Sequence, residues 1–192
     1  MRSSGSTPSP RPSAPVPLLL VVAGEDHPKA CTGRKLLKAG LVRAVSPGRR
    51  PRATPMLLDP HADRPLSMAD RPRVSVSGLL GVDCSWNRLG SRGGYPMGIA
   101  WLEGLRERRR LPWLLAGNPQ HFGRLGELNT AEAFAAALMI LGEPDRARAM
   151  VDRFPGGPGF LAVNRESFAR YAACQSEADV RTAESLIFGP PI

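Results

Sequence analysis

Three stretches of the sequence place small and polar residues directly after apolar runs. In the first, GVDCSWN (residues 81–87), Gly81, Asp83 and Trp86 stand where a strand is expected to meet a loop. Ligands bind at such strand ends in open α/β sheets. Asp83 could hold a hydroxyl or act as a general base, and Trp86 could form the wall of an apolar pocket. The residues alone leave a second interpretation open, in which Trp86 belongs to the core and Asp83 caps the turn.

The second stretch is HPKACTGRKL, residues 27–36. Thr32 and Gly33 precede an expected helix, so backbone N–H groups and one hydroxyl would be free near a strand end. That arrangement suits a carboxylate or a ribose. The alternative is that Thr32 only caps the helix and that the lysines are solvated.

The third stretch is LPWLLAGNPQHFG, residues 111–123, which ends in a tight Asn-Pro turn. Asn118 and His121 could contact a ligand there, although a turn asparagine and a surface histidine fit the pattern as well. The sequence contains neither GxGxxG nor a P-loop, which disfavours a standard dinucleotide or ATP site. It also contains no GxSxG, and no Cys–His pairing can be inferred, so nucleophilic catalysis is not indicated.

The composition favours a polyanionic partner. The chain has 192 residues, a formal net charge of +9 and a pI of about 10.6, with arginines clustered at 49, 50 and 52 and at 106 and 108–110. Nucleic acid is the commonest partner of such a surplus, although an arginine-rich surface can also serve solubility. The three cysteines and three histidines do not form metal-ligand spacings, so we expect no metal site. No apolar run is long enough for a bilayer, and the N-terminal stretch lacks the features of a signal peptide, so we expect a cytoplasmic protein without a membrane partner.

The hydrophobic pattern predicts an α/β fold. Residues 1–15 are Ser, Pro and Gly without core-forming side chains and are expected to be a disordered tail. Residues 16–116 are expected to form an α/β domain and residues 117–192 a helical one. The expected strands are residues 16–22, 41–45, 54–60, Val74 to Val82 and 111–119.

The expected helices complete this pattern. Short helices are expected after residue 33 and after Ser67, and an amphipathic one with a basic end over 99–110. In the C-terminal part, a strong helix should begin at Thr130 as N-cap and end at Gly142. Further helices are expected over 143–154, 164–175 and 179–187.

Four blocks in this order resemble one family: HPKACTGRKL, LLDPHADRPLS, DCSWNRL and RRLPWLLAGNPQHFGRLGELNTAEAFAAAL. They are similar to the small-subunit rRNA aminocarboxypropyltransferases of archaea and eukaryotes, over about residues 18–175. The resemblance implies a parallel five-stranded sheet with a SPOUT-like trefoil knot, and a helical domain threaded through it. It also implies transfer of the 3-amino-3-carboxypropyl group from S-adenosylmethionine (SAM) to N3 of a uridine or pseudouridine in small-subunit rRNA, with release of methylthioadenosine. The partner would be rRNA or a pre-ribosomal particle, and the protein a monomer.

The resemblance also implies where SAM would bind. The carried-over cofactor positions are Thr32, Leu58, Pro60, Val82, Trp86, Leu111, Gly126 and Thr130. Leu58 and Pro60 would line the adenine side, and Trp86 would cover the methyl group, so that the γ-methylene stays open to the nucleophile. Asp83 is the candidate general base, and the alternative is that it only positions cofactor or substrate.

Some positions depart from the family pattern. His27 stands where Asp is usual, and Gly126 replaces a larger, often aromatic residue, so a contact there would be through its backbone. The loop after Trp86 matches nothing in the family. Two other functions stay open: a SPOUT-type SAM-dependent rRNA methyltransferase, and a non-catalytic rRNA-binding ribosome assembly factor. A bulky Trp86 disfavours the first, and the intact cofactor blocks disfavour the second.

Overall fold

The fold is built on one parallel β-sheet. The computed structural model describes residues 14–23, 31–48, 51, 53–84, 95 and 97–189. Within them, five strands pair in the order β2-β1-β4-β3-β5, and every pair is parallel. The expected parallel five-stranded sheet is therefore confirmed. The strands are β1 (Leu18–Val22), β2 (Arg43–Ala44), β3 (Met56–Leu58), β4 (Leu79–Asp83) and β5 (Arg108–Arg109).

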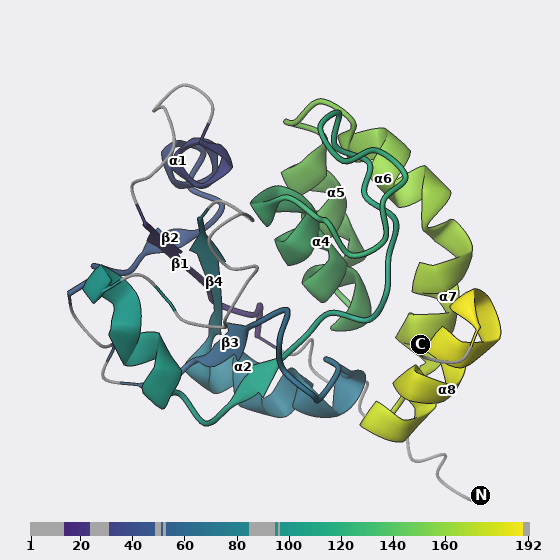
Figure 1. Ribbon diagram of the computed structural model, residues 1–192, viewed down its shortest axis with the longest axis horizontal. Helices are drawn as coiled ribbons and strands as arrows, with labels where there is room; N and C mark the ends of the chain where they lie inside the picture. Colours follow the sequence, from purple (N-terminus) through teal and green to yellow (C-terminus); the bar gives the residue numbers. More distant parts are fainter. Residues whose placement is uncertain are drawn as a thin grey trace, which may run out of the picture.

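Helices cover the sheet and fill the C-terminal half of the chain (Figure 1). The part of the chain up to β5 contains α1 (Thr32–Lys38), η1 (Met68–Asp70), α2 (Arg71–Ser77) and η2 (Met97–Gly104). The C-terminal half contains α4 (Thr130–Ile140), α5 (Pro144–Val151), α6 (Gly157–Val163), α7 (Arg165–Ala173) and α8 (Glu177–Phe188). None of the helices in the described residues is long and apolar enough to cross a membrane.

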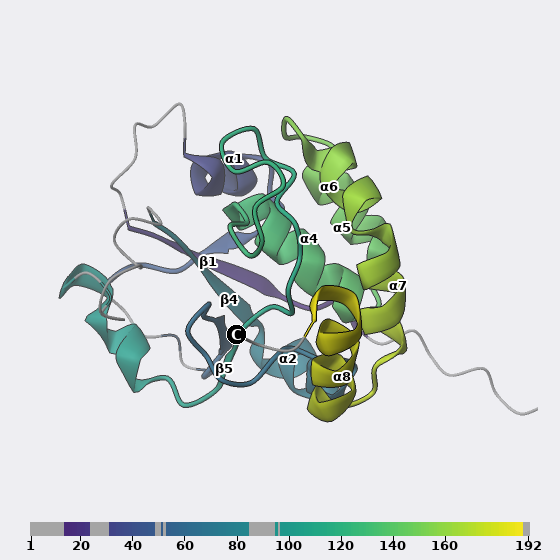
Figure 2. The ribbon, with the colours of Figure 1, turned by 45° about the vertical axis from the view of Figure 1, so that its right-hand side comes forward.

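The alternation of side chains along β1 divides the core into two layers. Leu18 and Leu20 pack into a cluster that includes residues of α1, α2 and α4 and extends to α8. Val21 points the other way, into a smaller cluster formed mainly by η2. Figure 2 shows α4 lying across the labelled strands β1 and β4. Because successive strand residues face opposite sides of the sheet, both sides of β1 are apolar.

The predicted fourth strand, Val74 to Val82, was wrong in its first half. Arg71–Ser77 is the helix α2, and the strand begins only at Leu79. The alternating Val-Ser-Val-Ser residues looked like a half-buried strand, but Pro72 fits the first turn of a helix and Val74 alone is buried while Val76 is 85% exposed. Gly78, at φ +84°, ends the helix and starts the strand.

The segment before α4 also differs from the prediction. The expected amphipathic helix over 99–110 is only the 3₁₀ helix η2 up to Gly104, and its basic end forms the edge strand β5. The expected strand over 111–119 is instead an open loop, which crosses in front of the C-terminal helices in Figures 1 and 2. This loop has its own buried polar partners on the helices, described below, in place of a sheet ladder.

Two helix caps lie one residue earlier than predicted. Asn129, not Thr130, caps α4, and it forms a capping box with Glu132. Cys31, not Thr32, caps α1, with its sulfur accepting from the Arg34 N–H. Both threonines are therefore the first residues of their helices, with side chains free of the capping role. Helix α6 was not predicted, because its sequence GPGFLAV has two glycines and a proline.

Candidate active site

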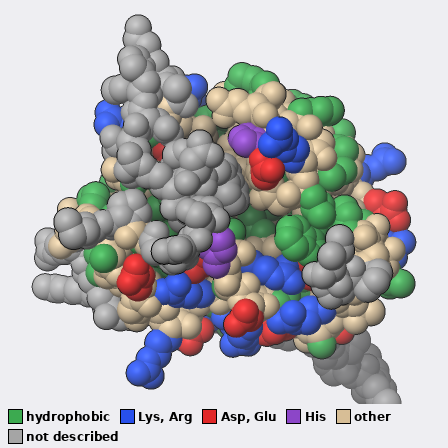
Figure 3. Space-filling model, viewed as in Figure 1, with side chains coloured by type: hydrophobic (Ala, Val, Ile, Leu, Met, Phe, Trp, Pro, Cys, Tyr) green, Lys and Arg blue, Asp and Glu red, His purple; other side chains and the backbone are tan. Residues whose placement is uncertain are grey.

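A cavity lies at the carboxyl ends of β3 and β4. Its volume is about 550 Å³, which is in the range of small-molecule and cofactor sites. The beginnings of α1 and α4 and the loop between β5 and α4 complete its walls. Figure 3 shows that this face is hollowed, with hydrophobic side chains in the hollow and Lys and Arg side chains along its lower rim.

Most of the sequence-predicted site residues line this cavity. Seven of the eight expected cofactor positions contribute to it: Thr32, Leu58, Pro60, Val82, Leu111, Gly126 and Thr130. The candidate base Asp83 lines it too, as do Asn118 and His121. Trp86, His27 and the arginines at 49, 50 and 52 lie outside the described residues. Residues far apart in the sequence therefore meet at one site.

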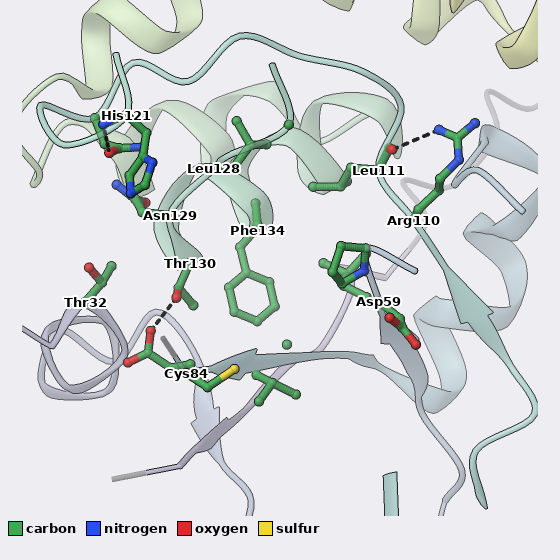
Figure 4. A pocket seen from close by; sticks show the side chains of 18 of the residues that line it. Thr32, Asp59, Cys84, Arg110, Leu111, His121, Leu128, Asn129, Thr130 and Phe134 are labelled. Atoms are coloured by element: carbon green, nitrogen blue, oxygen red, sulfur yellow. Dashed lines mark hydrogen bonds between the residues drawn. The ribbon is translucent and has the colours of Figure 1, made fainter. Parts of the chain in front are cut away.

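Asp83 connects three elements at the end of β4. One carboxylate oxygen, Oδ2, accepts from the Gly33 N–H at 2.9 Å and from the Cys31 thiol at 2.8 Å, both at the start of α1. The other, Oδ1, accepts from the hydroxyl of Thr130 at the start of α4 (Figure 4). Asp83 is only 7% exposed, and burial together with the Asp83 hydrogen bond raises the pKa of the Cys31 thiol. Cys31 is thus a neutral donor at neutral pH.

Two glycines allow the close approach that this arrangement needs. A Cβ on Gly33 would lie 2.5 Å from the Asp83 carboxylate, so only glycine lets the helix start sit this close to β4. On the opposite wall, a Cβ on Gly81 would lie 2.6 Å from the ring of Phe134. That ring projects from α4 into the centre of the cavity in Figure 4. The small residues of the GVDCSWN stretch therefore serve packing against α4 as well as the pocket.

A buried glutamate fastens the pocket loop to α4. Glu132 is 2% exposed, and its carboxylate accepts from the Gly117 N–H at 2.9 Å, the Asn118 side chain at 2.7 Å and the Asn129 N–H at 2.9 Å. Asn118 is therefore a structural residue as well as a lining one. In the same way, Asn164 exchanges two hydrogen bonds with the backbone of Leu115, at 2.8 and 2.7 Å.

The opposite side of the cavity is formed by the end of β3. Asp59 is 4% exposed and pairs with the Arg108 guanidinium at 2.8 Å. Tyr95 also lines the cavity, and its burial raises the pKa of its phenol well above the usual value, so the ring stays neutral. In Figure 4, Asp59 and Arg110 lie on one side and Thr32, Thr130 and His121 on the other.

His121 lies at the rim beside an acidic partner. Its Nδ1 contacts the Glu127 carboxylate, which Arg124 also approaches at 3.3 Å. The hydrogen bond from His121, with the nearby Arg124, holds the pKa of Glu127 below its usual value. The sequence had suggested His121 as a possible ligand contact, but nothing in its pattern indicated this partner.

Several lining residues were not predicted as site residues. They are Asp59, Cys84, Tyr95, Pro112, Trp113, Gln120, Leu128, Asn129, Ala133 and Phe134. Many of them are next to predicted positions in the sequence, and this adjacency was the only indication in the sequence that they line the cavity. Tyr95 had no such signal, because it lies in the loop that matched nothing in the family.

Comparison with known proteins agrees with this geometry. The family model described as "Ribosome biogenesis protein, C-terminal" matches residues 56–188. The 16S rRNA aminocarboxypropyltransferase of Methanosarcina acetivorans is 40% identical over 178 residues, covering 92% of this chain and 97% of the relative. The chain belongs to this family of ribosome biogenesis proteins, the small-subunit rRNA aminocarboxypropyltransferases.

Relatives from other organisms extend the match. The 18S rRNA aminocarboxypropyltransferase of Schizosaccharomyces pombe is 36% identical over 88% of this chain and 56% of the relative. A solved structure, the SAM-dependent rRNA:acp-transferase Tsr3 from Vulcanisaeta distributa, superposes with a TM-score of 0.71 at 31% identity, covering 91% of this chain and 94% of that one. The family resemblance seen in the four sequence blocks is thus confirmed.

A second family model matches the N-terminal part. It is described as "Possible Fer4-like domain in RNase L inhibitor, RLI" and covers residues 16–50. Iron–sulfur clusters are commonly held by four cysteines, but this segment contains one, Cys31, whose thiol is bonded to Asp83. The segment therefore does not carry the ligands of such a cluster.

Proposed function

We propose that this chain transfers the 3-amino-3-carboxypropyl group of SAM to N3 of a uridine or pseudouridine in small-subunit rRNA, releasing methylthioadenosine and giving up the N3 proton to solvent. The observation that carries the proposal is the convergence of seven expected cofactor positions on one cavity of about 550 Å³. Two relatives named 16S rRNA aminocarboxypropyltransferase are 40% identical to this chain, and the matches cover 97% and 95% of their lengths. The substrate RNA would reach the protein as rRNA or within a pre-ribosomal particle.

The cavity is suited to the chemical parts of SAM. Apolar side chains of Leu58, Leu111 and Leu128 line it and suit a flat base, while Thr32 and Thr130 offer hydroxyls. Both threonines are the first residues of helices, whose dipoles favour a carboxylate, and the next two N–H groups of α1 are already bonded, that of Gly33 to Asp83 and that of Arg34 to Cys31. We assign the adenine to the apolar side, with Pro60, and the amino-acid end to the two helix starts.

The protein's own contribution would be positional. When bound, SAM supplies a sulfonium that activates the adjacent γ-methylene toward a nucleophile. Thr32 and Thr130 would hold the amino-acid end so that this carbon faces the RNA; the Thr130 hydroxyl, which donates to Asp83, would accept from the ammonium group. Val82 and Gly126 would close the pocket. Trp86 would cover the methyl group, because burying a methyl costs no hydrogen bond. Orientation alone can then select which carbon is transferred.

We assign Asp83 a positioning role. Its two oxygens already accept three hydrogen bonds, from Cys31, Gly33 and Thr130, and it is 7% exposed. A carboxylate in this situation is engaged in joining α1 and α4 to the sheet, and has little capacity left to take a proton from RNA. Asp83 would act through the two helix starts that hold the cofactor.

Further proposals concern the whole molecule. We propose that the chain carries the SPOUT-like trefoil knot, with residues 16–116 and 117–192 as its two parts. The parallel sheet and the pocket-lining loop before α4 are consistent with such a fold. We also propose that the protein works as a monomer in the cytoplasm.

The test uses SAM labelled separately in its methyl and carboxyl carbons. The purified chain is incubated with small-subunit rRNA or pre-ribosomal particles, and label is counted in the RNA. Carboxyl label in RNA, with methyl label leaving as methylthioadenosine, is the expected result. Methyl label in RNA would instead show a methyltransferase, and the absence of SAM binding would favour an assembly factor.

A further inference from the structure

Exposed apolar side chains gather in the loop that forms one wall of the pocket. The large hydrophobic residues exposed within the described part of the chain are Val76, Trp113, Phe122, Leu125, Val163 and Leu186. Three of them fall between residues 113 and 125. Trp113 is 43% exposed and also lines the cavity. Apolar surface beside a pocket commonly marks a binding site.

Trp113 is held rigidly although it is exposed. Its backbone N–H donates to the Glu184 carboxylate at 2.9 Å, and its backbone carbonyl accepts from the Tyr171 hydroxyl at 3.0 Å. The Arg110 guanidinium lies over the indole, 5.8 Å from the ring centroid, and is itself fixed by two hydrogen bonds to Glu184 of 2.6 and 2.8 Å. A Cβ on Gly126 would lie 3.0 Å from the indole edge, so the ring is also packed from that side.

This rigidity indicates a recognition role. A ring whose backbone and one face are fixed loses little entropy when a ligand stacks on its open surface. Glu184 is 6% exposed and lies on α8, and Tyr171 is buried on α7. The two C-terminal helices therefore support the position of a surface side chain at the mouth of the pocket.

The surrounding charge indicates which partner fits. The protein carries a net charge of +9, and two arginines belong to the same loop region as Trp113: Arg110, paired with Glu184, and Arg124, whose side chain is 62% exposed and approaches Glu127 at 3.3 Å. Unpaired RNA bases stack on aromatic side chains while nearby arginines contact their phosphates. We propose that Trp113 is a stacking platform for an unpaired base of the RNA substrate, next to the nucleotide that enters the pocket.

The platform would meet a requirement of the reaction and rests on the proposed function. N3 of a uridine lies on the edge used for base pairing, so the target must be unpaired and turned toward the enzyme. Stacking of a neighbouring base on Trp113 would compensate part of the lost stacking in the RNA. It would also fix the strand relative to the helix starts at Thr32 and Thr130.

The experiment compares Trp113→Ala and Trp113→Phe with the unchanged protein. The probe is a fluorescein-labelled single-stranded oligouridine, and anisotropy gives its Kd. Stacking is commonly strong enough that Trp113→Ala should raise the Kd about tenfold, while Trp113→Phe keeps it within about threefold. Val76→Ala, which removes an 85% exposed side chain on α2, is the matched control and should change nothing.

Two further readouts separate stacking from other roles. Because no charge is removed, the dependence of Kd on salt concentration should have the same slope in Trp113→Ala as in the unchanged protein. Because Trp113 also lines the cavity, binding of SAM is measured separately by calorimetry, and it should stay within about twofold if the indole serves RNA and not the cofactor. Urea unfolding checks that each variant is folded.

The outcomes are distinct. An unchanged RNA Kd in folded Trp113→Ala would overturn the proposal. So would a loss of SAM affinity as large as the loss of RNA affinity, because Trp113 would then be a cofactor wall. Loss of pre-ribosomal particle binding with an unchanged oligouridine Kd would mean a protein partner and would also overturn it. If the Kd depends on Trp113 but no label reaches rRNA, the platform stands and the proposed function fails.

Discussion

Replacing Asp83 by Asn tests whether this carboxylate positions the cofactor or takes a proton. The Asn carbonyl can take the place of Oδ2 and still accept from Gly33 and Cys31. Its NH₂ can donate to Thr130, whose hydroxyl rotates to accept. What is lost is mainly the charge assistance of these bonds, so Asp83→Asn should lower the free energy of unfolding by about 1–2 kcal/mol. Asp83→Ala leaves buried donors without an acceptor and should cost about 3 kcal/mol or more.

The assay is single-turnover transfer of carboxyl label to rRNA across a series of pH values. If Asp83 positions the helix starts, Asp83→Asn should keep the rate within about tenfold, with the same pH profile and a raised KM for SAM. Removing a general base commonly costs about 10²–10⁴ in rate. A fall of that size in a variant whose unfolding free energy drops by no more than the expected amount of about 1–2 kcal/mol would refute the positioning role and restore Asp83 as the base.

Three other predictions concern stability. Gly81→Ala should lower the free energy of unfolding by about 1–3 kcal/mol, because its Cβ would lie 2.6 Å from the Phe134 ring; an unchanged urea midpoint would show that α4 can shift freely. Glu132→Gln replaces one accepting oxygen by an NH₂ group that faces other donors, and it should lower the free energy of unfolding by about 2 kcal/mol. An unchanged urea midpoint would show that the loop rearranges to accept the amide. Burial raises the pKa of the Tyr95 and Tyr171 phenols above the usual value of 10.0. As the pH rises, these phenols therefore ionise in the unfolded chain before they ionise in the folded one. Their contribution to the free energy of unfolding is fully present below about pH 10 and is lost progressively above it. The double Phe variant should lose less stability on that alkaline side, and an equally steep loss would assign it to other groups.

The parts of the fold that follow local rules were predictable from the sequence. The apolar runs at β1 and β3 and the helix α4 depend on neighbouring residues, and they occur where expected. The error at Val74 has the opposite cause. The alternating Val and Ser residues there matched a strand, but the segment is the helix α2, which buries Val74 on a single face.

The pocket was predictable in its lining but not in its support. Positions such as Thr32 and Leu58 were identified by resemblance, and they do line the cavity. The buried carboxylates that hold the loop could not be found in this way. Glu184 bonds to Arg110 across 74 positions of the chain, and no local pattern distinguishes it from the other glutamates of a surface helix. Such pairs become visible only when the packing of helices is known.

The bond between Glu184 and the pocket loop has a consequence for the timing of synthesis. The strands and α1 leave the ribosome early, and domains generally fold from the N-terminal side first. Glu184, on α8, is made after every residue that lines the cavity. The nascent chain can therefore form its sheet well before Trp113 and Arg110 acquire their anchor, so the ability to recognise RNA would arise only when synthesis of α8 is complete.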